Sequence, residues 1–475
     1  MKKSLFYLLL LCVFASCIPE SDLTDKLVEQ NCGNCHMVPD PKHLTAEIWE
    51  NSVMPYMADY FVWDTISTHG YANRNFYHKK GRQAMNDELW SILMDHFISN
   101  ALPSEGFRNS LTFKEQTAFD VEEQTNLMDI PATTSVRITG NNMLWLATVD
   151  SLLHLNVGNG HKSVYKTNSR ILDFYERDDN SLYILDAGEM RPHETAIGAL
   201  KTLDIHSGEE ATVLEKLRRP VRMTPIGGAV YISEFGHQIG ELSKFDVSNN
   251  SKSTVISLPG CFKVYEADID GDQVKEIIVE CSQALEGIYR INKSDGNVRK
   301  LIAFPPETGL SDFDIADIDN DGLVDFVVAL GDNADYSIMP KAYHGVRVFL
   351  NQGNLQFREE YRFDSYGTTQ VKLLDVNGDN LLDIVSSSFF PNSNQQSILV
   401  FEQTTEPELS FHVTAVKESI NGRWMTSDAG DLDGDGDIDM VFAGFIEGPT
   451  SVDSVDIERW YDKSVDVLIM RNKRN

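Results

Sequence analysis

Residues 317–325 read DIDNDGLVD, so that acidic side chains alternate with other residues before a short apolar run begins. The pattern returns as DIDGDQVKE at 268–276, DVNGDNLLD at 375–383 and DLDGDGDID at 431–439. Side-chain oxygens stand at positions 1, 3, 5 and 9 of each segment, and a Gly or Asn near position 6 permits a sharp turn. Oxygens with this spacing can surround one hard cation, and Ca²⁺ is the natural ion.

These four loops define the predicted calcium ligands. A single loop could be only a turn rich in Asp and Asn, but four loops in the same register favour about four cation sites. An EF-hand is disfavoured, because it needs flanking helices whereas β-type runs such as 326–328 and 384–385 flank the loops. The predicted ligands are Asp268, Asp270, Asp272, Glu276, Asp317, Asp319, Asp321, Asp325, Asp375, Asn377, Asp379, Asp383, Asp431, Asp433, Asp435 and Asp439.

The loops, together with LNQGNLQF at 350–357, resemble the FG-GAP or VCBS repeats of β-propellers. The resemblance is specific over residues 262–475 and implies blades that carry calcium loops there. Three units upstream, which begin near Val136, Ile171 and Val221, have a similar spacing of predicted strands but no acidic loop. Counting all the units predicts seven blades, within the ~4–8 that are typical of propellers.

A short motif predicts how the ring of blades closes. LQFR at 355–358 and LSFH at 409–412 each lie about one strand before the next blade, and LTFK at 111–114 has the same form. The last blade lacks such a strand, so we expect residues 110–119 to complete it and to remove its exposed edge. In the alternative, residues 110–119 form only an edge strand and do not close the ring. The expected all-β propeller thus occupies residues 110–475.

Residues 32–36 read CGNCH. In a CxxCH motif the two thiols, here Cys32 and Cys35, add to the haem vinyl groups while the adjacent His36 ligates the iron. Zinc would need a second ligand pair, and residues 37–110 contain no Cys, while a thioredoxin-like dithiol would need a following strand and helix. The motif therefore predicts covalently bound haem c.

The sixth iron ligand has three candidates, which are Met54, Met57 and Met85. The stretch 36–60 resembles cytochrome domains with a CH-x-x-P-x-P, Trp and VLPxM pattern, and Met57 falls on the Met of that pattern. The resemblance implies a small all-α, cytochrome c-like domain over residues 22–103 with Met57 as axial ligand. Met54 and Met85 stay open as alternatives.

The first residues are typical of an export signal. Two lysines precede an apolar run at 5–13 that is too short to span a bilayer, which predicts a signal peptide over residues 1–16. FASC at 14–17 resembles a bacterial lipobox, which implies lipidation of Cys17 and a lipid-anchored start over residues 17–21. An ordinary signal peptide with a chance Cys is the alternative. We expect the protein in the bacterial cell envelope, on the periplasmic side of the outer membrane or at the cell surface.

Two further cysteines flank an apparent hairpin. Cys261 and Cys281 lie symmetrically about Gly271, so antiparallel pairing would place them opposite each other and within disulfide reach. A pair of thiols in an exported protein can be oxidised. We expect a disulfide, with two buried free thiols as the alternative.

Composition limits the classes of partner. The chain has 475 residues, with 41 Lys and Arg against 72 Asp and Glu, so its formal charge is −31 and it would repel nucleic acid. The chain is too long to fold around a single hydrophobic core, which agrees with two modules joined by a linker at 104–109. Apart from the export signal, no segment is apolar enough to span a membrane, so contact with a membrane is expected only through the lipid anchor.

The two modules together resemble bacterial lipoproteins in which a cytochrome c head is joined to a seven-bladed FG-GAP propeller. This family implies haem binding and electron transfer without fixing a substrate. We therefore expect an electron-transfer protein rather than an enzyme, with a redox partner protein in the envelope. The calcium-stabilised propeller would be a scaffold that binds this partner or a polysaccharide or other surface polymer.

Two alternatives stay open. In the first, the propeller binds a quinone cofactor, oxidises a sugar or alcohol and passes electrons to the haem. Arg191, His193, Arg219 and His237 lie in loops that could contact such a cofactor, although loop residues of these types are usually solvated. In the second, the propeller is an integrin-like module for adhesion or sensing.

Overall fold

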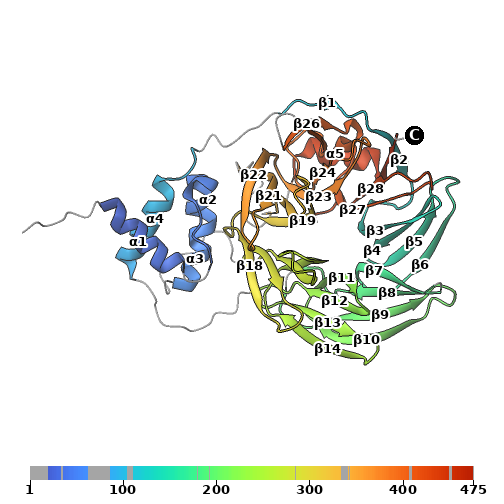
Figure 1. Ribbon diagram of the computed structural model, residues 1–475, viewed down its shortest axis with the longest axis horizontal. Helices are drawn as coiled ribbons and strands as arrows, with labels where there is room; N and C mark the ends of the chain where they lie inside the picture. Colours follow the sequence, from blue (N-terminus) through green and yellow to red (C-terminus); the bar gives the residue numbers. More distant parts are fainter. Residues whose placement is uncertain are drawn as a thin grey trace, which may run out of the picture.

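The computed structural model describes residues 20–33, 36–61, 86–103, 111–178, 180–191, 193–283, 285–332, 341, 343–405, 409–448 and 452–473. It contains an N-terminal helical segment followed by a ring of β-sheets (Figure 1). The predicted signal peptide, Cys17, Cys35, Met85 and the linker at 104–109 lie outside the described residues.

The ring is a seven-bladed β-propeller, as the repeat pattern predicts. The first three blades are β3 (Thr133–Gly140), β4 (Met143–Thr148), β5 (Ser151–Asn156) and β6 (Lys162–Lys166); β7 (Ile171–Asp178), β8 (Ser181–Asp186), β9 (Gly198–Asp204) and β10 (Glu210–Leu217); and β11 (Pro220–Ile226), β12 (Ala229–Glu234), β13 (Glu241–Asp246) and β14 (Ser251–Ile256). The fourth and fifth blades are β15 (Cys261–Ala267), β16 (Glu276–Cys281), β17 (Gly287–Ile291) and β18 (Val298–Ala303); and β19 (Leu310–Ala316), β20 (Asp325–Leu330), β21 (Gly345–Asn351) and β22 (Phe357–Asp364). The last two are β23 (Thr368–Leu374), β24 (Asp383–Ser388), β25 (Ile398–Thr404) and β26 (Ser410–Ala415), extended by β1 (Lys114–Glu115); and β27 (Trp424–Gly430), β28 (Asp439–Gly444), β29 (Val465–Asn472) and β2 (Phe119–Thr125).

Burial explains why the strands differ in composition. The second strands of blades three to seven are buried along their whole length, and strand 325–330 accordingly reads DFVVAL with a nearly continuous apolar run. Outer strands such as β6 alternate between exposed and half-buried positions. Apolar clusters fill the space between neighbouring blades, as where Val348 of blade five packs with Ile384 of blade six. The core therefore lies between the sheets.

A strand N-terminal to the first blade completes the last blade, as predicted, but it is β2 and not segment 110–119. Strand β2 pairs antiparallel with β29, from Phe119 opposite Asn472 to Thr125 opposite Val465, while β1 adds in parallel to β26 of blade six. The physical reason is where two aromatic side chains are buried. Phe119 belongs to the core cluster that includes Met470, whereas Phe113 packs against the cluster between blades five and six.

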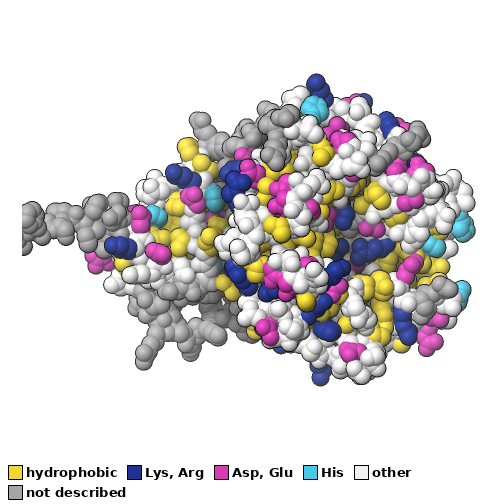
Figure 2. Space-filling view, in the orientation of Figure 1, with side chains coloured by type: hydrophobic (Ala, Val, Ile, Leu, Met, Phe, Trp, Pro, Cys, Tyr) yellow, Lys and Arg dark blue, Asp and Glu magenta, His cyan; other side chains and the backbone are white. Residues whose placement is uncertain are grey.

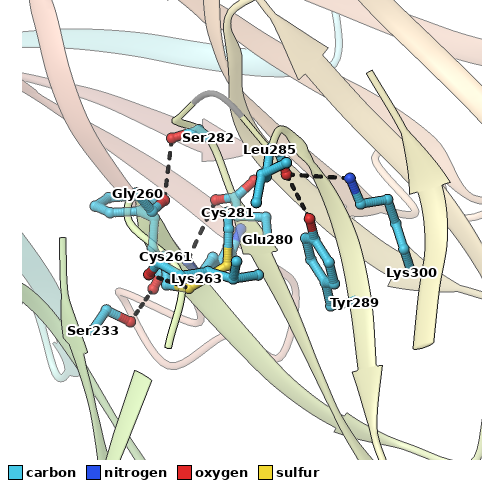
Figure 3. Close-up of a disulfide and its surroundings, with 12 residues drawn as sticks. Ser233, Gly260, Cys261, Lys263, Glu280, Cys281, Ser282, Leu285, Tyr289 and Lys300 are labelled. Carbon is cyan, nitrogen blue, oxygen red and sulfur yellow. Dashed lines mark hydrogen bonds between the residues drawn. A yellow bond between two sulfur atoms is a disulfide. The ribbon is translucent and has the colours of Figure 1, made fainter. Parts of the chain in front are cut away.

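Cys261 and Cys281 are direct neighbours in the antiparallel pairing of β15 with β16 (Figure 3). A disulfide joins them, and both residues are fully buried. The bond links the innermost strand of blade four to the strand beside it. The backbone next to it is held as well, since the Ser282 N–H donates to the Gly260 carbonyl oxygen at 2.9 Å.

The helical segment contains α1 (Glu20–Cys32), η1 (Pro41–His43), α2 (Ala46–Ile48), η2 (Trp49–Val53), α3 (Met54–Phe61) and α4 (Asp87–Ser99). Helix α4 begins where the acidic first turn predicts it, with the Asn86 side chain accepting a hydrogen bond from the Leu89 N–H at 2.8 Å. Apolar side chains from these helices form one small core around Trp49 and Phe97. No helix in the described part of the chain is both long and apolar enough to cross a membrane.

Candidate functional site

The helical segment brings three predicted haem-binding residues to one pocket. Cys32 is the last residue of α1, His36 follows the turn after that helix, and Met57 lies on α3. All three line the same cavity. Cys35 and Met85 cannot be placed beside them, since both lie outside the described residues.

The imidazole of His36 has a defined orientation. Its Nδ1 lies 2.8 Å from the carbonyl oxygen of Met37. A carbonyl oxygen only accepts, so Nδ1 carries the proton and donates it, which leaves the lone pair of Nε2 available. Metal-binding histidines commonly have this arrangement, because donation from the other ring nitrogen orients the ring.

The wall of this pocket is apolar and aromatic. Met54 is 3% exposed and belongs to the core, whereas Met57 is only partly buried at the edge of that core. The thioether of Met57 is therefore the more accessible of the two. The apolar lining consists of Trp49, Val53, Met54, Trp90, Leu93 and Phe97.

The pocket continues onto the propeller. One cavity of about 2220 Å³ is lined both by the helical segment and by the inner strands and loops of several blades. The two parts meet at the turn containing Asp40, whose N–H donates to Oε1 of Glu307 at 3.0 Å. Glu307 lies in the loop between β18 and β19. The cavity therefore lies between the helical segment and one face of the propeller.

The four acidic loops have a common backbone shape. Positions 4 and 6 of each loop have a positive φ angle, and these positions are Gly or Asn in every case except Gln273. Both carboxylate oxygens at position 1 accept hydrogen bonds from backbone N–H groups of the same loop, as Asp317 does from Asp321 and Gly322. These hydrogen bonds hold the position-1 carboxylate inside its own turn.

Three of the loops gather carboxylate oxygens that all lie within 4.8 Å of one another. The oxygens come from positions 1, 3 and 9, and in the 375–383 loop position 3 is Asn377. The fifth-position carboxylates are not part of these sets, and each accepts with one oxygen from the backbone N–H two residues on, as Asp321 does from Leu323 at 2.8 Å. The three sets are Asp268, Asp270 and Glu276; Asp317, Asp319 and Asp325; and Asp431, Asp433 and Asp439.

Two loops already contain an internal cation. The guanidinium of Arg290 on β17 contacts both Asp270, at 2.6 Å, and Glu276. In the last loop, Nη1 of Arg471 lies 3.0 Å from Oδ2 of Asp433. The 317–325 loop has no such ion pair among the described residues.

The carboxyls at position 9 of the acidic loops have raised pKa values. Burial raises the pKa of Asp325 to about 6 and the pKa of Asp383 to about 7, and the neighbouring carboxylates add to the rise. Burial also raises the pKa of Asp439. A bound cation would offset this repulsion, so the arrangement suits a divalent ion.

The propeller face of the cavity collects cationic side chains. The four loop residues named from the sequence, Arg191, His193, Arg219 and His237, all line this one cavity. Sequence reasoning missed the cations on the innermost strands, which are Arg137 on β3, Arg222 on β11, Lys263 on β15 and Lys372 on β23. Aligning the innermost strands on their buried residues, Met223 and Val264 for example, would have found two of them.

Residues 375–442 match the family model of FG-GAP-like repeats. A search of curated protein sequences finds no match. Among solved structures, the chain is similar to the N-terminal domain of Nup159, with 9% identity, a TM-score of 0.44, and coverage of 77% of this chain and 99% of that chain. It is also similar to a streptogramin B lyase (12% identity, TM-score 0.45, 75% and 100% covered) and to the hydrazine synthase of Kuenenia stuttgartiensis (12%, 0.43, 78% and 100%). The repeat match and the seven sheets together identify a β-propeller with FG-GAP-like repeats.

Proposed function

We propose that the protein is an exported c-type cytochrome that transfers electrons in the bacterial cell envelope, with its propeller as a scaffold for a partner. One observation carries the proposal, which is the pocket shared by Cys32, His36 and Met57. It offers a thiol for covalent attachment, an imidazole with Nε2 free, a thioether and an apolar wall. These residues fit haem.

A haem ligated by His36 and Met57 would carry single electrons and leave no open iron site for oxygen or peroxide. The chain's own residues orient and shield this site. The Met37 carbonyl oxygen holds the His36 ring, and Cys32 and Cys35 would form the thioether bonds. Trp49 and Phe97, whose ring centroids are 4.6 Å apart, keep water from the wall of the pocket.

The acidic loops would bind Ca²⁺, at about four sites, with a structural role. Their carboxylates support this role, because three sets of oxygens converge and burial raises the pKa of Asp325 to about 6. A bound cation would stabilise the blades and offset part of the negative charge. A lipid on Cys17 would tether the protein in the envelope, where a redox protein or a polysaccharide is the proposed partner.

The test is an absorption spectrum of the full-length protein produced in a host that attaches haem c. We expect a covalent haem spectrum and, in the ferric protein, the weak long-wavelength band of a methionine-ligated iron. Met57→Ala should abolish that band, while the control Met54→Ala should keep it. Purified protein without haem would refute the proposal, and an unchanged band in Met57→Ala would remove Met57 as ligand.

A second candidate is an oxidoreductase whose propeller oxidises a substrate and passes electrons to the haem. It is favoured by one observation, which is that Arg191, His193, Arg219 and His237 line the same cavity as His36. Adding sugars or alcohols to the oxidised protein tests this candidate. Substrate-driven reduction of the haem by the isolated protein would support it, and no reduction would exclude it for the compounds used.

A further inference from the structure

We infer that Asp437 is an additional acidic residue of the cation site in the last acidic loop, and that it makes this loop prefer cations of high charge. Asp437 stands at position 7 of the 431–439 loop, where the other three loops have Val274, Leu323 and Leu381. An aliphatic side chain offers no oxygen to a hard cation, so the last loop differs from the others in its chemistry. The inference rests on the proposed function, because it assumes that the loops bind Ca²⁺.

The Asp437 carboxylate is buried without a partner. The residue is only 7% exposed, and both of its carboxylate oxygens are shielded from solvent. Neither oxygen has a hydrogen-bond partner among the described residues. Position 7 is less buried in the other loops, where Val274 is 51% exposed and Leu323 and Leu381 are half-buried. Buried polar groups are rarely left unpaired, and an unpaired buried charge is costlier still, so a cation is the natural partner.

Asp437 lies close to the oxygens that would bind the cation. Oxygens of Asp431, Asp433 and Asp439 all lie within 4.8 Å of one another. Burial raises the pKa of Asp437 to about 6. The carboxylate of Asp435 adds most to this rise, followed by those of Asp439 and Asp433. Repulsion between charges falls with distance, so Asp437 adds its own charge to the set that would surround the cation.

Other carboxylates of this loop are held by the backbone, whereas Asp437 is not. Asp431 accepts from two N–H groups of its own loop, at 2.7 and 3.1 Å. Asp439 accepts from the N–H groups of Leu432 and Asn472, both at 2.9 Å. A cation would therefore meet two carboxylates that are already in place and a third, Asp437, whose oxygens are both available.

One internal cation offsets part of the negative charge of this loop. In the described part of the chain, Arg471 is the cation that pairs with the loop, through Asp433 at 3.0 Å. Figure 2 shows Lys and Arg side chains gathered in the hollow at the centre of the propeller, but none of the five carboxylates of the loop lines the cavity. The last loop thus has five carboxylates for one arginine, whereas the 268–276 loop has four for one. Without Asp437 the two loops would have equal numbers of carboxylates.

The charge of Asp437 should matter more for cations of higher charge. The Coulomb energy between a carboxylate and a cation is proportional to the charge of the cation. If the loss of Asp437 weakens Ca²⁺ binding on the order of 10-fold, it should therefore weaken the binding of trivalent Tb³⁺ ~30-fold. A side chain that only packs the loop would weaken the binding of both ions by the same factor.

Hydrogen exchange of the full-length protein, followed by mass spectrometry, tests the inference in each loop separately. The concentration of Ca²⁺ or Tb³⁺ that gives half of the full protection of residues 431–439 reports the affinity of the last loop. We expect Asp437→Leu, which introduces the residue that two other loops have here, to raise this concentration on the order of 10-fold for Ca²⁺ and ~30-fold for Tb³⁺. Residues 317–325, measured in the same sample, should not change.

Two further variants separate charge from folding. Asp437→Asn keeps the size of the side chain and loses its charge, so it should also weaken Tb³⁺ binding more than Ca²⁺ binding. Asp295→Asn removes an exposed carboxylate from the turn between β17 and β18 and should leave both affinities unchanged. Thermal melting in excess chelator checks that each variant folds.

Two results would overturn the inference. One is equal half-protection concentrations for residues 431–439 in the wild-type protein and Asp437→Leu. The other is a loss of affinity by the same factor for Ca²⁺ and Tb³⁺, which would assign Asp437 a packing role. Failure of Ca²⁺ to protect any of the four loops in the wild-type protein would instead refute the proposed calcium binding on which the inference rests.

Discussion

Nδ1 of His43 lies 2.8 Å from Oε1 of Glu307, and this contact joins the helical segment to the propeller. The same carboxylate oxygen accepts from the Asp40 N–H, and the rings of His43 and Tyr343 lie 4.5 Å apart between centroids. Glu307 is only 3% exposed, so its hydrogen bonds are shielded from water and are costly to lose. This carboxylate therefore holds two groups of the helical segment against the propeller, beside the contact of the two rings.

Glu307→Gln should loosen this contact, because a neutral amide accepts more weakly than a carboxylate. We expect faster hydrogen exchange at the Asp40 N–H and at residues 42–43, with little change in the melting temperature of the propeller. Hydrogen exchange followed by mass spectrometry measures both regions. Glu360→Gln is the matched control, since Glu360 forms an exposed pair with Arg358 on β22. Equal exchange in the two variants would contradict the prediction.

The acidic loops should differ in how much they gain from Ca²⁺. We expect Asp319→Asn to remove a large part of the difference in melting temperature between calcium and a chelator, because its loop has no internal cation. Asp270→Asn should remove less, because Arg290 already pairs with Asp270 and Glu276. Each occupied site would contribute about 2.7 kcal/mol when the free ion is at 100 times its Kd.

Asp295 provides the control for these variants. Its carboxylate closes an exposed hairpin turn by accepting from the Asn297 N–H at 2.8 Å, outside the acidic loops. Asp295→Asn should leave the calcium-dependent shift unchanged. The prediction would be contradicted if Asp270→Asn reduced the calcium-dependent shift in melting temperature as much as Asp319→Asn does. It would also be contradicted if the chelator had no effect on the melting temperature of the wild-type protein.

Local patterns were enough to predict the blades and the loops. The loop shape follows from residues such as Asn320 and Gly322. Their positive φ angles are typical of Asn and Gly, which recur at these positions of the repeat. The direct pairing of Cys261 with Cys281 likewise follows from the symmetry of one hairpin. Each of these features depends on residues that are close in the sequence.

Contacts between distant residues were not predictable in this way. Arg290 reaches the first acidic loop only because β17 pairs with β16, where Arg290 lies opposite Ile278. The contact of His43 with Glu307 joins residues 264 positions apart and has no local signal. The closing strand was placed too early because Phe113 and Phe119 are both followed by strand-like sequence, and burial in the ring distinguishes them.

The burial of these two aromatic residues predicts unequal effects on stability. Phe119 is 2% exposed within the core of the last blade, whereas Phe113 is only partly buried beside Phe363. Phe119→Ala should cost about 3 kcal/mol or more of folding stability, because it leaves a cavity where the ring closes. Phe113→Ala is the control and should cost less. Melting temperatures of the two variants measure the difference, and a larger loss in Phe113→Ala would refute the assignment of β2 as the closing strand.

Asp466 on β29 is an acid buried beside the closing strand. Its Oδ2 accepts from the Leu127 N–H at 2.7 Å, while Oδ1 is shielded from solvent and has no partner among the described residues. Burial raises the pKa of Asp466 from 3.8 to about 6, and hydrogen bonding to the Leu127 and Met128 N–H groups and the Lys162 ammonium offset only part of this rise. The folded protein therefore binds this proton more tightly than the unfolded chain does.

Because the folded pKa is raised, the stabilising contribution of protonated Asp466 is complete below about pH 4 and is lost as the pH rises through about 6. Asp466→Asn keeps an acceptor for the Leu127 N–H and carries no charge. The variant should therefore melt at a higher temperature than the wild-type protein at pH 7.5, and this advantage should shrink as the pH falls toward 4. Thermal melting across this pH range measures the difference, with Asp462→Asn on the exposed face of α5 (Ser454–Lys463) as control. An advantage that is independent of pH, or equal in the Asp462 variant, would mean that the charge of Asp466 is not its cause.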